Sequence, residues 1–575
     1  MSLLAVALIC GLCLLLAYRF YARLLARLLK LDPEARTPAV ELRDDVDYVP
    51  ISPTFLLGQH FSAIAAAGPI VGPILAGVMF GWVPALLWIL LGCVFIGGVH
   101  DLGALIASVR HRACSIAEVV EEHMSRRAYL LFLSFLWIAI VYIVVAFTDI
   151  TASSFLGVQE LEDGTQVSGG GIATSSMLYL ALPVMMGLLL RYTKLTLAWA
   201  TVIFLPLVGL AIWVGQYIPL DLAAALGVPD ERAHRAWDVL LLVYCFVASI
   251  VPMWILLQPR GHLGGYFLYA ALLSGLLGIL FGGQRVAYPA FTTWTTTAGV
   301  PLFPMLFVTI ACGACSGFHA VIASGTTSKQ LRRETDAKLI GYGTMLLEGA
   351  VAVVALCCVM MLSRDASVLR NPKPNVIYAL GIAKFLSVVH INPVLGVSFG
   401  LMAFTTFVYD TLDVCTRLGR YIVQELTGWR SRSGRLLATA FTVGVPLLFV
   451  MRTVTDQAGN VIPAWRVFWE LFGASNQLLA ALTLLGITVW LWRTQRARWV
   501  LPVTGAPAAW MYVMSTWALL RFIRQGFFDA AWRFTVPTSP VPWVALVLVG
   551  LAGLMLVEAF RVLYRTRAAA MPATQ

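Results

Sequence analysis

The chain has 575 residues, of which 60% are hydrophobic and only 12% are charged. Soluble domains average roughly 45–50% apolar and about 25% charged residues, so the composition excludes a soluble globule, a disordered chain and an ordinary nucleic-acid-binding protein. The net charge of +11 comes from 40 Lys and Arg residues, and it raises the question of which side of a membrane they occupy.

Apolar runs that are long enough to cross a bilayer, about 20 residues each, follow one another along the chain. We predict an all-α polytopic membrane protein with about 15 transmembrane helices. They are expected at residues 2–20, 59–80, 84–108, 128–157, 173–191, 196–216, 237–257, 263–281, 302–324, 338–362, 394–418, 436–451, 467–492, 499–520 and 543–562. A further apolar stretch, 374–390, carries Lys384 and is predicted to be interfacial or re-entrant.

The distribution of basic residues predicts the orientation. With the N-terminus outside and 374–390 not spanning, 28 of the 40 Lys and Arg residues fall on the cytoplasmic side, where basic residues normally gather. We therefore expect the N-terminus outside and the C-terminus in the cytoplasm. The expected parts are an N-terminal transmembrane helix at 1–22, a cytoplasmic loop at 23–58, a transporter core at 59–420 and C-terminal transmembrane helices at 421–575.

Three segments are predicted to interrupt their helices within the membrane. They contain the pairs Gly68-Pro69 and Gly72-Pro73 (68–73), the string ASIVP (248–252) and a run of small and hydroxyl residues (312–327). Unwound backbone at this depth lines the binding sites of many transporters, although a kink or a small-residue packing face is the alternative for each segment. The first two lie five spans apart in antiparallel helices, which predicts an inverted five-helix repeat.

Ionisable side chains inside the predicted spans are the candidate functional groups, because they are costly in a bilayer. Histidine together with buried carboxylates is typical of proton coupling. The proton-coupling candidates are His60, Asp101, His319, Glu348 and Asp413. A structural alternative pairs Asp413 with Arg417, one helical turn further on.

No cofactor, metal site or enzymatic activity is predicted. The histidines at 60, 100 and 319 show no spacing typical of metal ligands. The chain also lacks a Walker A motif, a G-x-S-x-G motif and an H-E-x-x-H motif.

Seven strings, ordered along residues 31–481, resemble one bacterial family of peptide and pyruvate transporters, the carbon starvation proteins. They are LDPEARTPAV (31–40), DYVP (47–50), GQHFSAIAAAGPIVGPILA (58–76), IACGACSGFHAVIASGTTSKQL (310–331), ETDAKLIGYGTMLLEG (334–349), LDVCTRLGR (412–420) and LFGASNQLLAA (471–481). One departure is Gln59, which stands where the family usually has the first histidine of G-H-H-F.

The resemblance implies an inner-membrane secondary transporter that takes up short peptides or pyruvate, is induced on carbon limitation in some members, and is coupled to protons in the pyruvate branch. It also implies a fold like that of the leucine transporter, with an inverted five-helix repeat and broken first helices. The polar positions that match the family are His60, Asp101, Ser316, His319, Ser324, Thr326, Thr327, Glu348, Asp413, Asn476 and Gln477.

We therefore predict a proton-coupled importer of small carboxylates that works by alternating access. Its partners would be the substrate, protons and the lipid bilayer, and no nucleic acid. The sequence does not decide between a monomer, a homo-oligomer and a complex with a sensor kinase. The predicted substrate-binding residues are Gly68, Gly72, Ser249, Ser316, His319, Ser324, Thr326, Thr327, Asn476 and Gln477. The alternative is a nutrient-sensing receptor that binds the same ligand without transport, and a channel or membrane enzyme ranks third.

Overall fold

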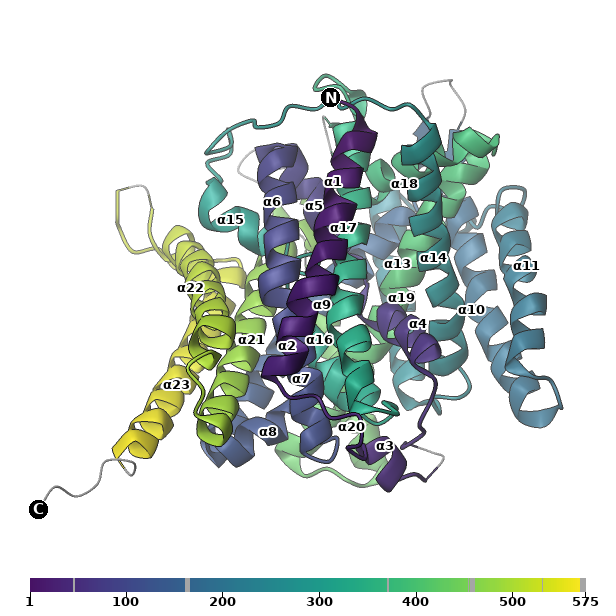
Figure 1. Ribbon diagram of the computed structural model, residues 1–575. Helices are drawn as coiled ribbons and strands as arrows, with labels where there is room; N and C mark the ends of the chain where they lie inside the picture. Colours follow the sequence, from purple (N-terminus) through teal and green to yellow (C-terminus); the bar gives the residue numbers. More distant parts are fainter. Residues whose placement is uncertain are drawn as a thin grey trace, which may run out of the picture.

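Long apolar helices make up almost the whole protein in the computed structural model (Figure 1). The structure describes residues 1–44, 47–160, 166–369, 372–452, 454–455, 461–529 and 531–568. Within these ranges, 12 helices are long and apolar enough to cross a membrane, and one bent pair adds a thirteenth. The predicted all-α polytopic architecture is thus confirmed, although the count of 15 helices is not.

The first half of the chain is helical apart from one short hairpin. Its strands are β1 (Val158–Glu160) and β2 (Gln166–Ser168). Its helices are α1 (Leu3–Leu16), α2 (Ala22–Leu28), α3 (Pro38–Glu41), α4 (Pro53–Ile64), α5 (Gly68–Phe80), α6 (Trp82–Gly92), α7 (Gly98–Arg110), α8 (Ile116–His123), α9 (Arg126–Ser154), α10 (Gly169–Tyr192), α11 (Leu197–Gly215), α12 (Leu222–Leu226), α13 (Asp230–Ile250) and α14 (Leu257–Phe281).

The second half has the same character, with a second hairpin of β3 (Val454–Thr455) and β4 (Val461–Ile462). Its helices are α15 (Leu302–Thr309), α16 (Phe318–Ile322), the π-helical turn η3 (Ala323–Thr327), α17 (Thr344–Met360), α18 (Pro374–Leu386), α19 (Pro393–Thr427), α20 (Arg432–Val450), α21 (Ala464–Gln495), α22 (Ala506–Phe527) and α23 (Val541–Ala568). Helix α18 is too short to count among the candidate spans.

Two predicted spans account for the difference in the count. The stretch 302–324 is divided between α15 and α16, and neither piece is long enough to cross alone. The stretch 499–520 corresponds mainly to α22, which carries Arg521 and Arg524 in its last turns and is not among the helices that qualify by hydropathy.

Three predicted boundaries between parts of the chain also differ in the structure. The first helix continues from Leu3 to Leu28, past Arg23 and Arg27, because leucine, alanine and arginine are good helix formers. The loop expected at 23–58 is accordingly shorter, since α4 already begins at Pro53. The boundary expected at residue 420 falls inside α19.

The helices differ in how much of their surface other helices cover. In the most apolar stretch of α21, 94% of the residues are buried, against 28% for α11 and for α23. Helix α21 packs on α9, and α19 also packs on α9, so these three form the centre of the bundle. Figure 1 places α11 at one flank and α22 and α23 at the other. The exposed leucines, valines and phenylalanines of the flanking helices are suited to lipid.

The first predicted interruption lies just before its expected position. Helices α4 and α5 meet at a bend of 52°, and the non-helical residues are Ala65–Ala67 rather than 68–73. Pro69 occupies the first turn of α5, where its missing N–H costs no hydrogen bond. Pro73 lies inside α5 without ending it.

The second predicted interruption, 248–252, is the end of a helix. Helix α13 ends at Ile250, and α13 and α14 are separate candidate spans. Val251 is extended, with φ −63° and ψ 143°, as is usual for a residue before proline. The prediction of a break within one span 237–257 was therefore wrong.

Candidate functional site

Besides the α4–α5 bend, the structure has a second interruption, between α15 and α16. It packs directly on the α4–α5 bend. Residues 310–317 lie between the two helices. A Cβ atom placed on Gly68 would lie 2.4 Å from Cys312 Sγ, and one on Gly72 would lie 2.5 Å from the carbonyl oxygen of Thr309. Glycine is needed at both positions because the two interrupted segments approach so closely.

Side chains of α21 hold the α15–α16 interruption in place. Asn476 Oδ1 accepts a hydrogen bond from the Phe318 N–H at 3.1 Å, and Asn476 Nδ2 donates to Ser316 Oγ at 3.0 Å. Gln477 Nε2 donates to the carbonyl oxygen of Phe307 at 2.5 Å. Backbone groups released by a broken helix need such partners in a membrane. Asn476, Gln477 and Ser316 thus stabilise the interruption itself.

His319, on α16, lies between two buried carboxylates from different helices. Its Nδ1 is 2.8 Å from Asp101 Oδ2 on α7, and its Nε2 is 3.1 Å from Glu348 Oε2 on α17. His100 Nδ1 is 2.7 Å from the other oxygen of Asp101. All four side chains are inaccessible to solvent or nearly so. The structure therefore brings together three of the predicted proton-coupling residues.

The charge of the His319 cluster depends on how many protons it holds. Asp101 accepts from two imidazoles, one on each carboxylate oxygen. One proton placed between His319 and Glu348 leaves the cluster with a net charge of −1, and a second proton makes it neutral. Burying net charge is expensive, so the cluster is suited to take up and release a proton.

His60 is the fourth predicted proton-coupling residue, and it lies on α4 close to the bend. Its Nδ1 is 2.8 Å from Thr327 Oγ1 at the end of η3. Both side chains are buried, and His60 Nε2 has no hydrogen-bond partner among the described residues. This contact joins α4, which precedes the first interruption, to η3, which follows the second interruption.

A second ionic cluster surrounds Arg260, which lies between the expected spans 237–257 and 263–281. Arg260 is fully buried on α14. Its Nε donates to Asp410 Oδ1 at 2.8 Å, and its Nη1 is 2.5 Å from Asp413 Oδ2. Ser62, two residues from the end of α4, donates to Asp410 Oδ2 at 2.9 Å, and Tyr244 donates to Asp413 at 3.0 Å.

The alternative in which Asp413 pairs with Arg417 is wrong. Arg417 Nη2 instead donates to the carbonyl oxygens of Ala248 at 2.7 Å and Val251 at 2.6 Å. It neutralises the free carbonyl end of α13, where cations are favoured. Asp410 and Asp413 lie three residues apart on one helix face. Such a pair indicates that a cation is buried beside it, but not that the cation is Arg260.

The family model for "Carbon starvation protein CstA" matches residues 1–377 and 363–518. The chain belongs to the CstA family. Among its relatives, "Pyruvate/proton symporter BtsT" of Escherichia coli (strain K12) is 32% identical over 88% of this chain and 79% of its own length. "Peptide transporter CstA" of Bacillus subtilis (strain 168) is 30% identical over 94% of each chain. This CstA-family protein is thus a membrane transporter and not an enzyme.

Solved structures give weaker matches. A manganese transporter of Eremococcus coleocola, in complex with an aromatic bis-isothiourea substituted compound, covers 92% of this chain and 99% of its own, with 14% identity and a TM-score of 0.48. MhsT in complex with L-phenylalanine covers 89% of this chain and 99% of its own, with 11% identity and a TM-score of 0.46. At these scores neither match establishes a shared fold, so the inverted repeat stays a prediction.

Among the substrate-binding residues predicted for this CstA-family chain, Ser324 and Thr326 use their hydroxyl groups for local structure, whereas the buried Ser249 hydroxyl has no hydrogen-bond partner among the described residues. Ser249 lies in the last turn of α13, and its carbonyl oxygen accepts from Arg420 at 2.5 Å. Ser324 donates to the Ala320 carbonyl at 2.7 Å and accepts from the Ile116 N–H, while Thr326 is exposed and donates to Ile322. None of the three hydroxyl groups contacts the His319 cluster in the described structure.

Proposed function

We propose that this CstA-family protein is a proton-coupled secondary transporter that imports small carboxylate nutrients, short peptides or pyruvate, across the bacterial inner membrane. Expression linked to carbon starvation is part of the proposal, as is an orientation with the N-terminus outside. The observation that carries it is the buried contact of His319 with Asp101 and Glu348, close to two interrupted helices. The names of the relatives support the same substrate classes and, for BtsT, proton symport.

The proton would be carried by the His319–Glu348 pair. Glu348 Oε1 has no hydrogen-bond partner within the described residues, so it can hold a proton without losing an existing bond. His319 spans the gap between α7 and α17 and can accept a proton from either side. Loading the pair removes the net charge of the cluster, which would favour movement of the helices that enclose it.

The substrate carboxylate would bind at the two interruptions. At the start of α5, Pro69 has no N–H and the Ile70 N–H donates to the Ala67 carbonyl oxygen at 3.1 Å. The Gly68 N–H and the positive end of the helix dipole would therefore hold the anion at membrane depth. Because Gly68 and Gly72 pack against Cys312 and the Thr309 carbonyl, the two interrupted segments would have to separate for the carboxylate to enter. His60, whose Nε2 has no hydrogen-bond partner among the described residues, and Thr327 are the polar side chains that would hydrogen-bond the rest of the substrate. Both ring nitrogens of His319 already face Asp101 and Glu348.

The Arg260 cluster would respond to a movement of α4, because it is bonded to that helix. Ser62 on α4 is bonded to Asp410, and Asp413 Oδ1 has no hydrogen-bond partner in the part of the chain that is described. Arg260 with two carboxylates carries a net charge of −1, so a proton on Asp413 would neutralise it. Asp413 therefore remains a candidate for a second proton site.

Uptake by the purified protein in proteoliposomes tests the proposal. Labelled pyruvate and a labelled dipeptide are presented separately, with and without an inward proton gradient. We expect one of them to accumulate above its external concentration only when the gradient is present, and a protonophore to abolish the accumulation. If both bind tightly and neither moves, the sensing receptor is the better account; if neither binds nor moves, the substrate class is wrong.

A further inference from the structure

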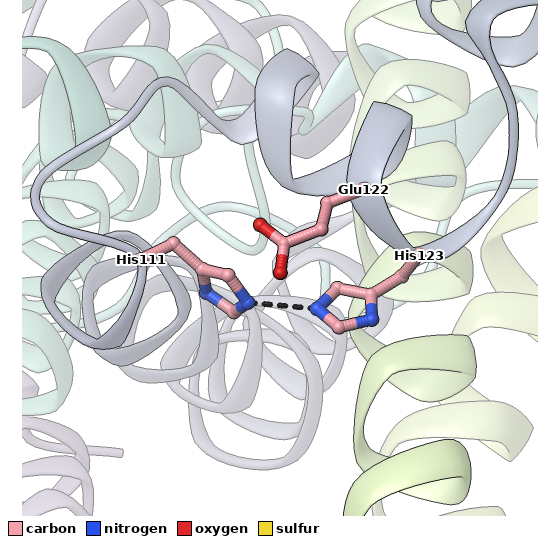
Figure 2. Close-up of side chains that lie close together, drawn as sticks. All are labelled: His111, Glu122 and His123. Atoms are coloured by element: carbon pink, nitrogen blue, oxygen red, sulfur yellow. Dashed lines mark hydrogen bonds between the residues drawn. The ribbon is translucent and has the colours of Figure 1, made fainter.

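Two histidines meet at the membrane face that carries α3 and α8, at the bottom of Figure 1. His111 directly follows α7, and His123 is the last residue of α8. Their Nε2 atoms are 2.7 Å apart, and the Glu122 carboxylate points toward the same space (Figure 2). The three side chains offer ligand atoms that all lie within 4.8 Å of one another. We propose that this corner is a binding site for a divalent transition-metal ion, with Zn²⁺ as the best match.

The hydrogen bonding of His111 orients a lone pair toward the site. His111 Nδ1 is 2.5 Å from the carbonyl oxygen of Ala107. A carbonyl can only accept, so Nδ1 carries the proton and Nε2 of the neutral ring is left with its lone pair. A histidine ligand whose other nitrogen is bonded to a carbonyl is the usual arrangement at protein metal sites.

The backbone around the two rings is also fixed. Arg493 Nη1 donates to the carbonyl oxygen of His123 at 2.7 Å, and the His111 ring packs edge-on against Trp490 at 5.4 Å between centroids. Both contacts come from α21, whose apolar stretch is 94% buried, more than in any other candidate span of the described residues. The two imidazoles are thus held facing each other rather than brought together by flexible loops.

The ligand set suits zinc. Two imidazole nitrogens and one carboxylate oxygen are common protein ligands of Zn²⁺, which leaves one position for water. With Zn–N bonds of about 2.0–2.1 Å, tetrahedral geometry needs the nitrogens roughly 3.3 Å apart, so the rings must separate by about half an ångström. Both histidines lie at helix C-termini, whose partial negative charge favours a cation. The carboxylate of the exposed Glu122 already faces the two rings.

Zinc binding to the full-length protein in detergent tests this site. A chromophoric zinc indicator in competition with the protein should report one site per chain. H111A and H123A should each weaken that binding at least tenfold. H390A, an exposed histidine on the opposite face, is the matched control and should bind as the wild type does. A wild type that takes no Zn²⁺ from the indicator would overturn the proposal and leave a histidine–histidine hydrogen bond only.

A second group of possible ligands, Asp149, His234 and Asp238, provides a competing site within the same molecule. Zinc binding that is lost in H234A and retained in H111A would assign the metal there and would contradict the proposal. A measurement on the wild type alone avoids any dependence on the folding of variants. Zn²⁺ should protect His111 and His123, and not His390, from diethylpyrocarbonate, as read by peptide mass spectrometry; equal modification with and without Zn²⁺ would also overturn it.

Discussion

At the scale of single residues, Glu348 is the group on which the proposed coupling depends most. It is fully buried and lies 3.1 Å from His319 Nε2. Glutamine has the same shape but cannot exchange a proton, so E348Q should still exchange substrate across the membrane and should lose accumulation driven by a proton gradient. For one proton per substrate molecule, a gradient of one pH unit corresponds to about tenfold accumulation. Counterflow and gradient-driven uptake, measured in the same proteoliposomes, separate the two activities.

A carboxylate outside the cluster controls for that experiment. Glu558 on α23 is mostly buried and pairs with Arg561 at 2.9 Å, so E558Q also removes one buried charge. It should keep both activities. Gradient-driven accumulation that survives in E348Q would show that Glu348 does not carry the proton.

Arg260 makes a separate prediction about stability. Replacing it with alanine leaves Asp410 and Asp413 buried without their cation, and removing one partner of a buried ion pair typically costs about 3–5 kcal/mol. We expect R260A to lower the unfolding temperature strongly, while R430A, which removes an exposed arginine, leaves it unchanged. The triple variant R260M/D410N/D413N should recover much of the loss, and thermal unfolding in detergent measures all three. An R260A protein as stable as R430A would contradict the buried ion cluster.

The residues illustrate what sequence reasoning can and cannot reach. Asp101, His319 and Glu348 were recognisable because a charge inside an apolar run stands out. Arg260 was not, because it sits at the edge of an apolar run, where a basic residue normally marks the cytoplasmic boundary. Whether two ionisable residues far apart in the sequence touch depends on how the helices pack. No local pattern in one sequence shows this packing.

At the scale of elements, the contact between the two interrupted helices is the feature to test. G68A would place a methyl group 2.4 Å from Cys312 Sγ, and overpacking of this kind typically costs about 1–3 kcal/mol. We expect G68A to lower both the unfolding temperature and the transport rate. G11A is the matched control, because a Cβ at Gly11 meets nothing within 4 Å.

A second-site change distinguishes this contact from a general effect of alanine. C312G removes the Sγ and Cβ atoms that a methyl group at position 68 would meet, so the double variant G68A/C312G should be closer to wild type in stability than G68A alone. Equal loss in the single and double variants would mean that the close approach of the two segments is not what requires glycine at position 68.

The elements also explain why the predicted breaks were only partly right. Gly-Pro pairs indicated an interruption in 59–80, but a proline is tolerated in the first turn of a helix, so the break lies before Pro69 rather than at it. The string ASIVP looked like a break inside a span because its flanks are apolar on both sides. In the structure it ends α13, and Arg417 and Arg420 bind the free carbonyl groups there. Such capping by a distant helix has no signature in the local sequence.

At the scale of the whole molecule, charged residues are scarce, so few buried ionisable groups are available for proton coupling. Among the described residues, α4 bonds the Arg260 cluster through Ser62 and packs on α16 and α17, the helices that carry His319 and Glu348. A movement of α4 would alter both clusters at once. This links the protonation of the clusters to the opening of the bundle, which is the central claim of the proposed mechanism.

Proton movement driven by substrate tests that claim most directly. Proteoliposomes that contain a trapped pH indicator receive external pyruvate, or the dipeptide if that is the transported substrate, with no gradient imposed beforehand. The account predicts acidification of the lumen with the wild type and with E558Q, and none beyond protein-free vesicles with E348Q. Substrate uptake by the wild type without acidification, or equal acidification with E348Q, would contradict it.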